Sequence, residues 1–161
     1  YVLRIKTEVH TMNKNREWVI TANAAVCRIF QHDGKTKPLA EVKSVDWPRG
    51  RMAGRDMDSD RPGRAFDSAG QGRHAMEPRA DPHAEELRFA REIATILEEA
   101  QRGGKFSRLI VIAAPRMLGS LRECLPESVS RLAVTEIDKD LTDYSTDELS
   151  AWLDKERSRN D

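Results

Sequence analysis

This chain contains an uninterrupted apolar run, Leu109-Ile110-Val111-Ile112-Ala113, that has no polar face. A strand of this kind must be covered on both of its faces, as the central strands of α/β sheets are. The run ends shortly before Pro115 and is far too short to span a bilayer. We therefore expect a layered α/β domain with this run in the middle of its sheet.

The segment before this run predicts a long amphipathic helix. Asp81 suits the N-cap, and Pro82 suits the first helical position because its missing amide is not needed there. Apolar residues recur at helical spacing through residues 84–101, and Gly103-Gly104 ends the pattern. Glu85 and Glu86 fall in the early turns, where we expect solvated carboxylates that the helix dipole favours.

Shorter patterns complete the order of elements. Asn23-Ala24 and His32-Asp33-Gly34 predict tight turns between the first strands, and Ser145-Thr146-Asp147-Glu148 matches a capping box. The whole order predicts a mixed five-stranded sheet with helices on its faces, the βββαβαβα order of the ribonuclease H-like architecture. The further expected strands are 18–22, 25–30, 39–45 and 132–137, and the further expected helices are 117–125 and 145–153.

The stretch 46–82 lacks hydrophobic periodicity. Its 37 residues include five glycines, four prolines, seven arginines and seven acids. Such a composition buries too little apolar surface to offset the entropy of ordering, so we expect a long mobile loop. The remaining boundaries follow from the same reasoning: one domain over residues 15–155, a flexible extension over 1–14 and a polar tail over 156–161.

Charge and cysteine content limit the class of partner. The 27 basic and 27 acidic residues balance, which does not indicate a DNA-binding protein. Cys27 and Cys124 have no metal-site spacing and are expected to be free thiols in a reducing cytosol. With no apolar stretch typical of a signal peptide or a membrane span, the chain is expected to be cytoplasmic and to have no membrane partner.

The chain offers no convincing active site. Metal-dependent nucleases need clustered carboxylates at strand ends, but Ala22-Asn23 and Ala113-Ala114 stand there. The four histidines are scattered, and no glycine-rich phosphate loop with its lysine is present. We therefore expect no metal and no cofactor, and we interpret the protein as non-enzymatic.

Five stretches in order span most of the chain: Trp18-Val19-Ile20-Thr21-Ala22 with Ala25 and Arg28-Ile29-Phe30; Ser59-Asp60-Arg61-Pro62-Gly63-Arg64-Ala65-Phe66; Phe89-Ala90-Arg91-Glu92-Ile93; Ala113-Ala114-Pro115-Arg116-Met117-Leu118-Gly119-Ser120-Leu121-Arg122; and Glu136-Ile137-Asp138-Lys139-Asp140-Leu141-Thr142. Together they resemble the bacterial host-attachment protein family. Asn23 is a departure, since the family commonly has an acid after the first strand. The resemblance implies a domain similar to the middle domain of archaeal and eukaryotic peptide-chain release factors.

Release factors carry a Gly-Gly-Gln loop ahead of a long helix, and Ala69-Gly70-Gln71-Gly72 is similar to it. Here Ala69 replaces the first glycine, and Gln71 stands ten residues before the expected N-cap. The resemblance implies an alternative function, a peptidyl-tRNA hydrolase-type activity through Gly70 and Gln71. The other interpretation is a flexible glycine-rich loop that happens to contain a glutamine.

Two segments are candidates for binding a protein partner, or RNA or the ribosome. In the long loop, Arg61 and Arg64 can grip phosphates or form internal ion pairs, and Phe66 needs a surface to pack on, its own sheet or a partner. At the end of the central strand, Pro115 and Arg116 begin a helix whose free amides suit an anion. The alternative there is a packed turn in which Gly119 allows close helix approach.

Overall fold

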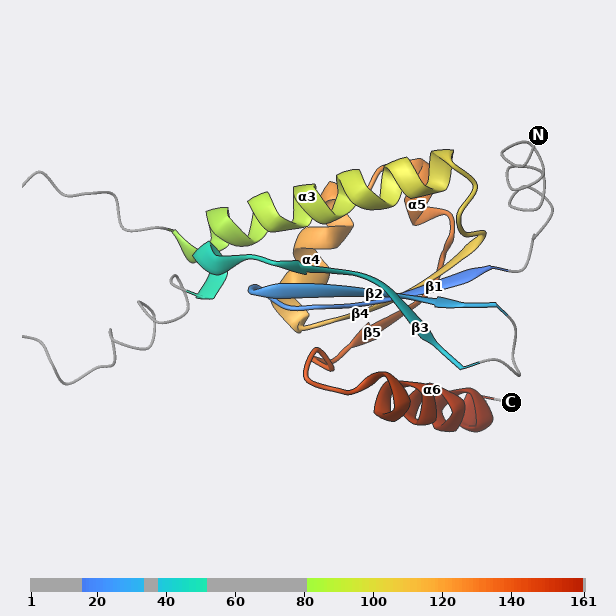
Figure 1. Cartoon of the computed structure of the whole chain (residues 1–161). Coiled ribbons are helices and arrows are strands. Elements are labelled where there is room, and N and C mark those ends of the chain that lie inside the picture. Colours follow the sequence, from blue (N-terminus) through green and yellow to red (C-terminus); the bar gives the residue numbers. More distant parts are fainter. Residues whose placement is uncertain (1–15, 34–37, 52–80, 161) are drawn as a thin grey trace, which may run out of the picture.

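The computed structural model of the chain describes residues 16–33, 38–51 and 81–160. A short helical turn at residues 48–51 follows the third strand. The elements, labelled as in Figure 1, are in chain order β1 (Glu17–Ala22), β2 (Val26–His32), β3 (Ala40–Asp46), α3 (Pro82–Arg102), β4 (Arg108–Ala113), α4 (Pro115–Cys124), α5 (Glu127–Ser130), β5 (Ala133–Asp138) and α6 (Thr146–Asn160).

The strands form one mixed sheet in the order β3-β2-β1-β4-β5. β1, β2 and β3 pair antiparallel, whereas β4 runs parallel to both β1 and β5. β4 is therefore an interior strand, and all of its residues except Arg108 are buried. This placement confirms the predicted position of the apolar run and the predicted order of elements.

Helices cover both faces of the sheet. α3, α4 and α5 lie on one face and α6 lies on the other (Figure 1). Because successive side chains of a strand point to opposite faces, each central strand contributes to two cores. Ile20 and Val111 pack in the core beneath α3, and their neighbours Val19 and Ile112 pack in the core beneath α6.

Helix α3 begins and ends where the sequence predicts. The Asp81 carboxylate accepts a hydrogen bond from the His83 amide over 3.0 Å, and Gly104 adopts a left-handed φ of +65° just beyond the last turn. The prediction of solvated carboxylates was wrong, because Glu85 and Glu86 are only 4% and 6% exposed. Both acids face neighbouring segments rather than solvent.

Some boundaries differ from the prediction. Asp46 belongs to β3 and residues 48–51 are helical, so the first residues of the predicted loop 46–82 belong to regular elements, while residues 52–80 lie outside the described residues. The predicted polar tail, 156–161, is helical as far as Asn160. α4 begins at Pro115 rather than at residue 117, and α5 is a single turn that is too short to show a periodicity.

Both cysteines are free thiols, as predicted. Cys27 is fully buried on β2, and desolvation raises the pKa of its thiol to about 12. Within the described ranges, no helix combines the length and the apolar character that a membrane crossing needs.

Candidate functional site

Three parallel strands end at the same side of the sheet. β1, β4 and β5 end at Ala22, Ala113 and Asp138, and the end of β3 joins them because Asp46 pairs with Val26 at the start of β2. Open α/β sheets bind ligands outside the carboxyl ends of their strands. We call this region the carboxyl edge; it comprises residues 23–25, 46–51, 81–86, 114–117 and 138–148.

Asn23 joins two loops of the carboxyl edge. Its side-chain oxygen accepts hydrogen bonds from the amides of Ala25 and Val26, over 2.8 and 3.0 Å, which fixes the turn between β1 and β2. Its amide nitrogen donates to Asp140 Oδ2 and to Thr142 Oγ1, both over 3.0 Å. Asn23 therefore fastens this turn to the loop between β5 and α6.

Arg28 of β2 holds the same loop through its side chain. The guanidinium donates to the backbone carbonyl of Thr142 over 3.1 Å and to that of Tyr144. Its other nitrogens form a two-pronged pair with the Glu41 carboxylate, at 3.2 and 3.0 Å. This pair lowers the pKa of Glu41. The loop after β5 is thus fixed by main-chain bonds as well as by side chains.

Asp140 is the acid that the network holds ionised. Partial burial works to raise its pKa, but hydrogen bonds from Thr142 and Asn23 outweigh burial and lower it. The Thr142 hydroxyl donates to Asp140 Oδ1 over 2.6 Å, and the Thr142 amide donates to the same atom over 3.1 Å. The hydrogen bonds that the Asp140 carboxylate accepts therefore come from Asn23 and Thr142 of the same chain.

On the other face of the sheet, Trp47 and Glu85 form what we call the clamp. Trp47 Nε1 donates to Glu85 Oε2 over 3.2 Å, and the indole stacks on Phe89 with ring centroids 5.1 Å apart. The Trp47 amide donates to the Ala25 carbonyl over 2.7 Å, and Arg88 pairs with the second oxygen of Glu85 at 2.7 Å. The clamp joins the chain just before residue 52 to the chain just after residue 80.

Gly50 brings the helical turn 48–51 against the turn between β1 and β2. A Cβ atom at Gly50 would lie 1.8 Å from the Ala24 carbonyl oxygen, far inside van der Waals contact. Only glycine permits this approach. The turn 48–51 is therefore packed in place, although its composition resembles that of the stretch 52–80 that follows in the sequence.

Pro115 and Arg116 begin α4 beside these residues. The Ala114 amide donates to the Ala22 carbonyl over 3.1 Å, so the start of α4 adjoins the end of β1. Arg116 is more than half exposed and lies 3.6 Å from the buried Glu86 carboxylate. The expectation that Gly119 allows close helix approach was wrong, because a Cβ there would meet no atom within 4 Å.

The rim of the carboxyl edge is acidic. Segment 138–148 contains five acids and one lysine, and all five acids are exposed: Asp138, Asp140, Asp143, Asp147 and Glu148. Segment 52–80 adds five arginines and five acids, so it does not offset this charge. Among the described residues, no three or more His, Cys, Asp and Glu side chains are grouped so that they could hold a metal ion.

A second charged cluster lies at the opposite end of β1. The buried Glu17 carboxylate contacts Arg157 of α6, Arg108 of β4 at 3.6 Å and His32 of β2 at 3.9 Å. Glu17 thus joins the last turns of α6 to the starts of β1 and β4 and to the end of β2. The cluster has an evident structural role, which is to fasten the C-terminal helix to the sheet.

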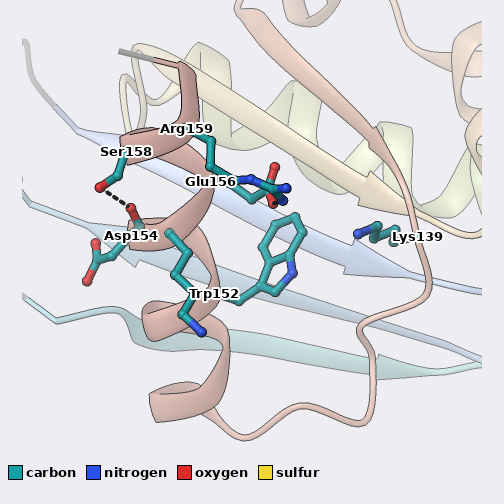
Figure 2. A pocket seen from close by; sticks show the side chains of 7 residues that line it. Lys139, Trp152, Asp154, Glu156, Ser158 and Arg159 are labelled. Atoms are coloured by element: carbon teal, nitrogen blue, oxygen red, sulfur yellow. Dashed lines mark hydrogen bonds and ion pairs between the residues drawn. The ribbon is translucent and has the colours of Figure 1, made fainter.

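Helix α6 and Lys139 border an open depression of about 630 Å³ (Figure 2). Lys139 Nζ lies 5.3 Å from the centre of the Trp152 ring, and Arg159 pairs with Glu156 at 3.5 Å. Positive and negative groups alternate around the depression: Lys139, Lys155 and Arg159 against Asp154 and Glu156. This balance of charge selects no class of ligand.

The structure places only part of the predicted binding set. Pro115 and Arg116 lie at the carboxyl edge. The other predicted site residues, Arg61, Arg64, Phe66, Gly70 and Gln71, lie outside the described residues. Reasoning from the sequence missed Asn23, Trp47, Glu85, Glu86, Asp140 and Thr142 as parts of one site; the available signals were an asparagine directly after a strand and a tryptophan in a polar stretch.

Comparisons with known proteins agree with the predicted resemblance. Residues 18–153 match the model of a family described as protein required for attachment to host cells. No curated protein matches the chain.

Similar solved structures include a chain described as an archaeal protein (9% identity, TM-score 0.49, 88% of this chain and 35% of that chain). They also include an archaeal translation termination factor (11%, 0.45, 87% and 34%) and the Ppx/GppA phosphatase of Aquifex aeolicus (13%, 0.39, 76% and 35%). The chain spans about a third of the length of each of these proteins.

Proposed function

We propose that this chain, which belongs to the family of proteins required for attachment to host cells, is a non-enzymatic interaction module that binds another protein at its carboxyl edge. The observation that carries the proposal is the clamp. Trp47 and Glu85 join the two ends of segment 52–80 beside the start of α4. A 29-residue insertion that leaves and re-enters at one fixed place is suited to presenting side chains to a partner.

The charge of the rim favours a protein partner over RNA. A nucleic acid would approach five exposed acids in segment 138–148, and segment 52–80 brings no net positive charge to this edge. Nucleic-acid affinity depends on neutralising phosphates with Lys and Arg, which this rim opposes. The complementary partner is a protein that places basic groups on segment 138–148 and acidic groups on Arg116 and the arginines of segment 52–80. In that complex Arg61, Arg64 and Phe66 contact the partner together with Pro115 and Arg116.

The proposal includes a cytoplasmic location, which the two free thiols support. An effect on attachment to host cells is then indirect, through a partner inside the cell. Secretion of the protein into the culture medium would contradict this part of the proposal.

A loop replacement tests the proposal. Residues 52–80 are replaced by a short Gly-Ser linker, and both forms are used as bait in cell extract, with unfolding curves to show that the fold persists. We expect a protein captured by the full chain and lost with the linker, and loss also with Arg116→Glu as the only change. Equal capture by all three forms would contradict the proposal.

Two further assays test the alternatives of RNA binding and peptidyl-tRNA hydrolysis. Salt-sensitive co-sedimentation with ribosomes or tRNA that Arg61→Ala with Arg64→Ala abolishes would identify RNA as the partner instead. Cleavage of peptidyl-tRNA that Gln71→Ala abolishes would identify the hydrolase. We expect neither, because the described part of the carboxyl edge holds nine acids against four Lys and Arg residues.

A further inference from the structure

Both outer strands of the sheet contain a single extra residue. In β3, Lys43 pairs with Ile29 and Glu41 pairs with Phe30, so Val42 has no partner in β2. In β5, Ala133 pairs with Leu109 and Thr135 pairs with Ile110, so Val134 has no partner in β4. Each edge of the sheet therefore carries a β-bulge at a valine.

These two valines are also the large apolar side chains that stand most exposed. Val42 is 49% and Val134 is 50% exposed, and no other large apolar residue is exposed in the described part of the chain. β3 and β5 are the outer strands of the described sheet, so each has a row of backbone groups that no described strand pairs with. Such a row, combined with an exposed valine, is where a strand of another molecule would add.

A bulge counters strand addition by geometry. The extra residue breaks the regular spacing of the outward amides and carbonyls and increases the local twist. An incoming strand then cannot form a continuous ladder. Charged residues beside the bulges act in the same direction, with Glu41 and Lys43 on β3 and Glu136 on β5.

We propose that the bulges at Val42 and Val134 protect the two edges of the sheet. They keep the chain from pairing with other strands, including those of a second copy. The chain is then a monomer at its working concentration. A partner binds through side chains and loops rather than by extending the sheet. This inference rests on the strand registers and does not depend on the proposed function.

Deletion of one valine at a time tests the proposal. Removing Val42 makes Glu41 and Lys43 neighbours, as their partners Phe30 and Ile29 already are, so the ladder becomes regular and no side chain changes face. The same holds for Val134, because Ala133 and Thr135 pair with adjacent residues of β4. Each deletion therefore removes the bulge and the exposed valine together.

Val42→Thr and Val134→Thr are the matched controls, because they keep the bulge and remove only apolar surface. Sedimentation is measured over a wide range of concentration, with circular dichroism to verify the fold. We expect the natural chain and both threonine variants to be monomers, and at least one deletion variant to double its mass or more as concentration rises. If a deletion prevents folding, the oligomeric state of the natural chain still tests the proposal.

Three results would overturn the proposal. The first is a natural chain that dimerises and loses this association when β3 or β5 is disrupted. The second is a pair of folded deletion variants that stay monomeric at the highest concentration. The third is association of the threonine variants as strong as that of the deletions, which would assign the effect to apolar surface instead of the bulge.

Discussion

The indole nitrogen of Trp47 donates a hydrogen bond to the buried carboxylate of Glu85 over 3.2 Å, which joins the segment after β3 to the first turn of α3. The two residues are separated by a stretch with no hydrophobic periodicity. The contact therefore fixes where that stretch begins and ends, whatever path it follows.

Trp47→Phe should lower the free energy of unfolding by about 1–3 kcal/mol, because it leaves the buried Glu85 oxygen without this donor. An aromatic ring remains to stack on Phe89. Trp18→Phe is the matched control: Trp18 stacks on Phe106, but its nitrogen donates over a longer 3.4 Å to the less buried Gln31. Urea unfolding curves compare the two, and equal losses would argue against the clamp.

Gly50→Ala and Gly119→Ala should have opposite effects. The first places a Cβ against the Ala24 carbonyl oxygen and should destabilise the fold by about 1–3 kcal/mol. The second adds a Cβ in open space within α4 and should stabilise it by roughly 0.5–1 kcal/mol, because alanine loses less backbone entropy in a helix. Thermal unfolding of both variants decides, and a neutral Gly50→Ala would refute the packed turn.

Asp140 should make stability depend on pH in acid. Its pKa is lowered in the fold, so the unfolded chain binds the proton first as pH falls. The contribution is complete above the ordinary pKa of an aspartate and is lost as pH falls through the lowered value. Asp140→Asn should flatten the acid limb of a stability curve measured from pH 6 downwards to about pH 3. Asp143→Asn, a change at an exposed acid of the same loop, should leave that limb as steep as in the natural chain.

Arg157→Met should loosen the end of α6. Glu17 then loses its contact to the helix while its carboxylate stays buried, at an expected cost of about 1.5–3 kcal/mol. Amide hydrogen exchange should accelerate in the last turns of α6 more than in α3. Arg159→Met removes an exposed pair with Glu156 and should change little. Similar exchange in both variants would show that Glu17 does not fasten the helix.

Elements with a long or continuous pattern could be predicted from the sequence. The run 109–113 and the helix that opens at Asp81 have a periodicity and caps that leave little choice, and the structure places both as expected. α5 was not predicted, because a helix of four residues is too short to show a periodicity. The turn 48–51 was not predicted either. It is held in place by the close approach of Gly50 to Ala24, a contact between two segments that the local composition does not encode.

The site was harder to predict because it is built from single residues of several loops. Pro115 and Arg116 were found from their position after a buried strand. Glu85 and Glu86 were expected in solvent, since their place in the first turns of a helix is the same whether or not other segments cover them. What buries them is Trp47 on one side and the start of α4 on the other, and neither pairing has a signal in the local sequence.

A photo-reactive residue tests most directly whether the carboxyl edge is the binding surface. It is placed at Gly119, which lies in α4 two residues beyond the carboxyl edge and where a Cβ atom would meet no atom within 4 Å, and at Arg131, which is exposed just before β5 at the opposite end of the strands. Irradiation of living cells should give a protein adduct at position 119 and none at 131, and the adduct should vanish when residues 52–80 are replaced by a linker. Equal adducts at both positions, or an adduct at 119 that persists without that segment, would contradict the account.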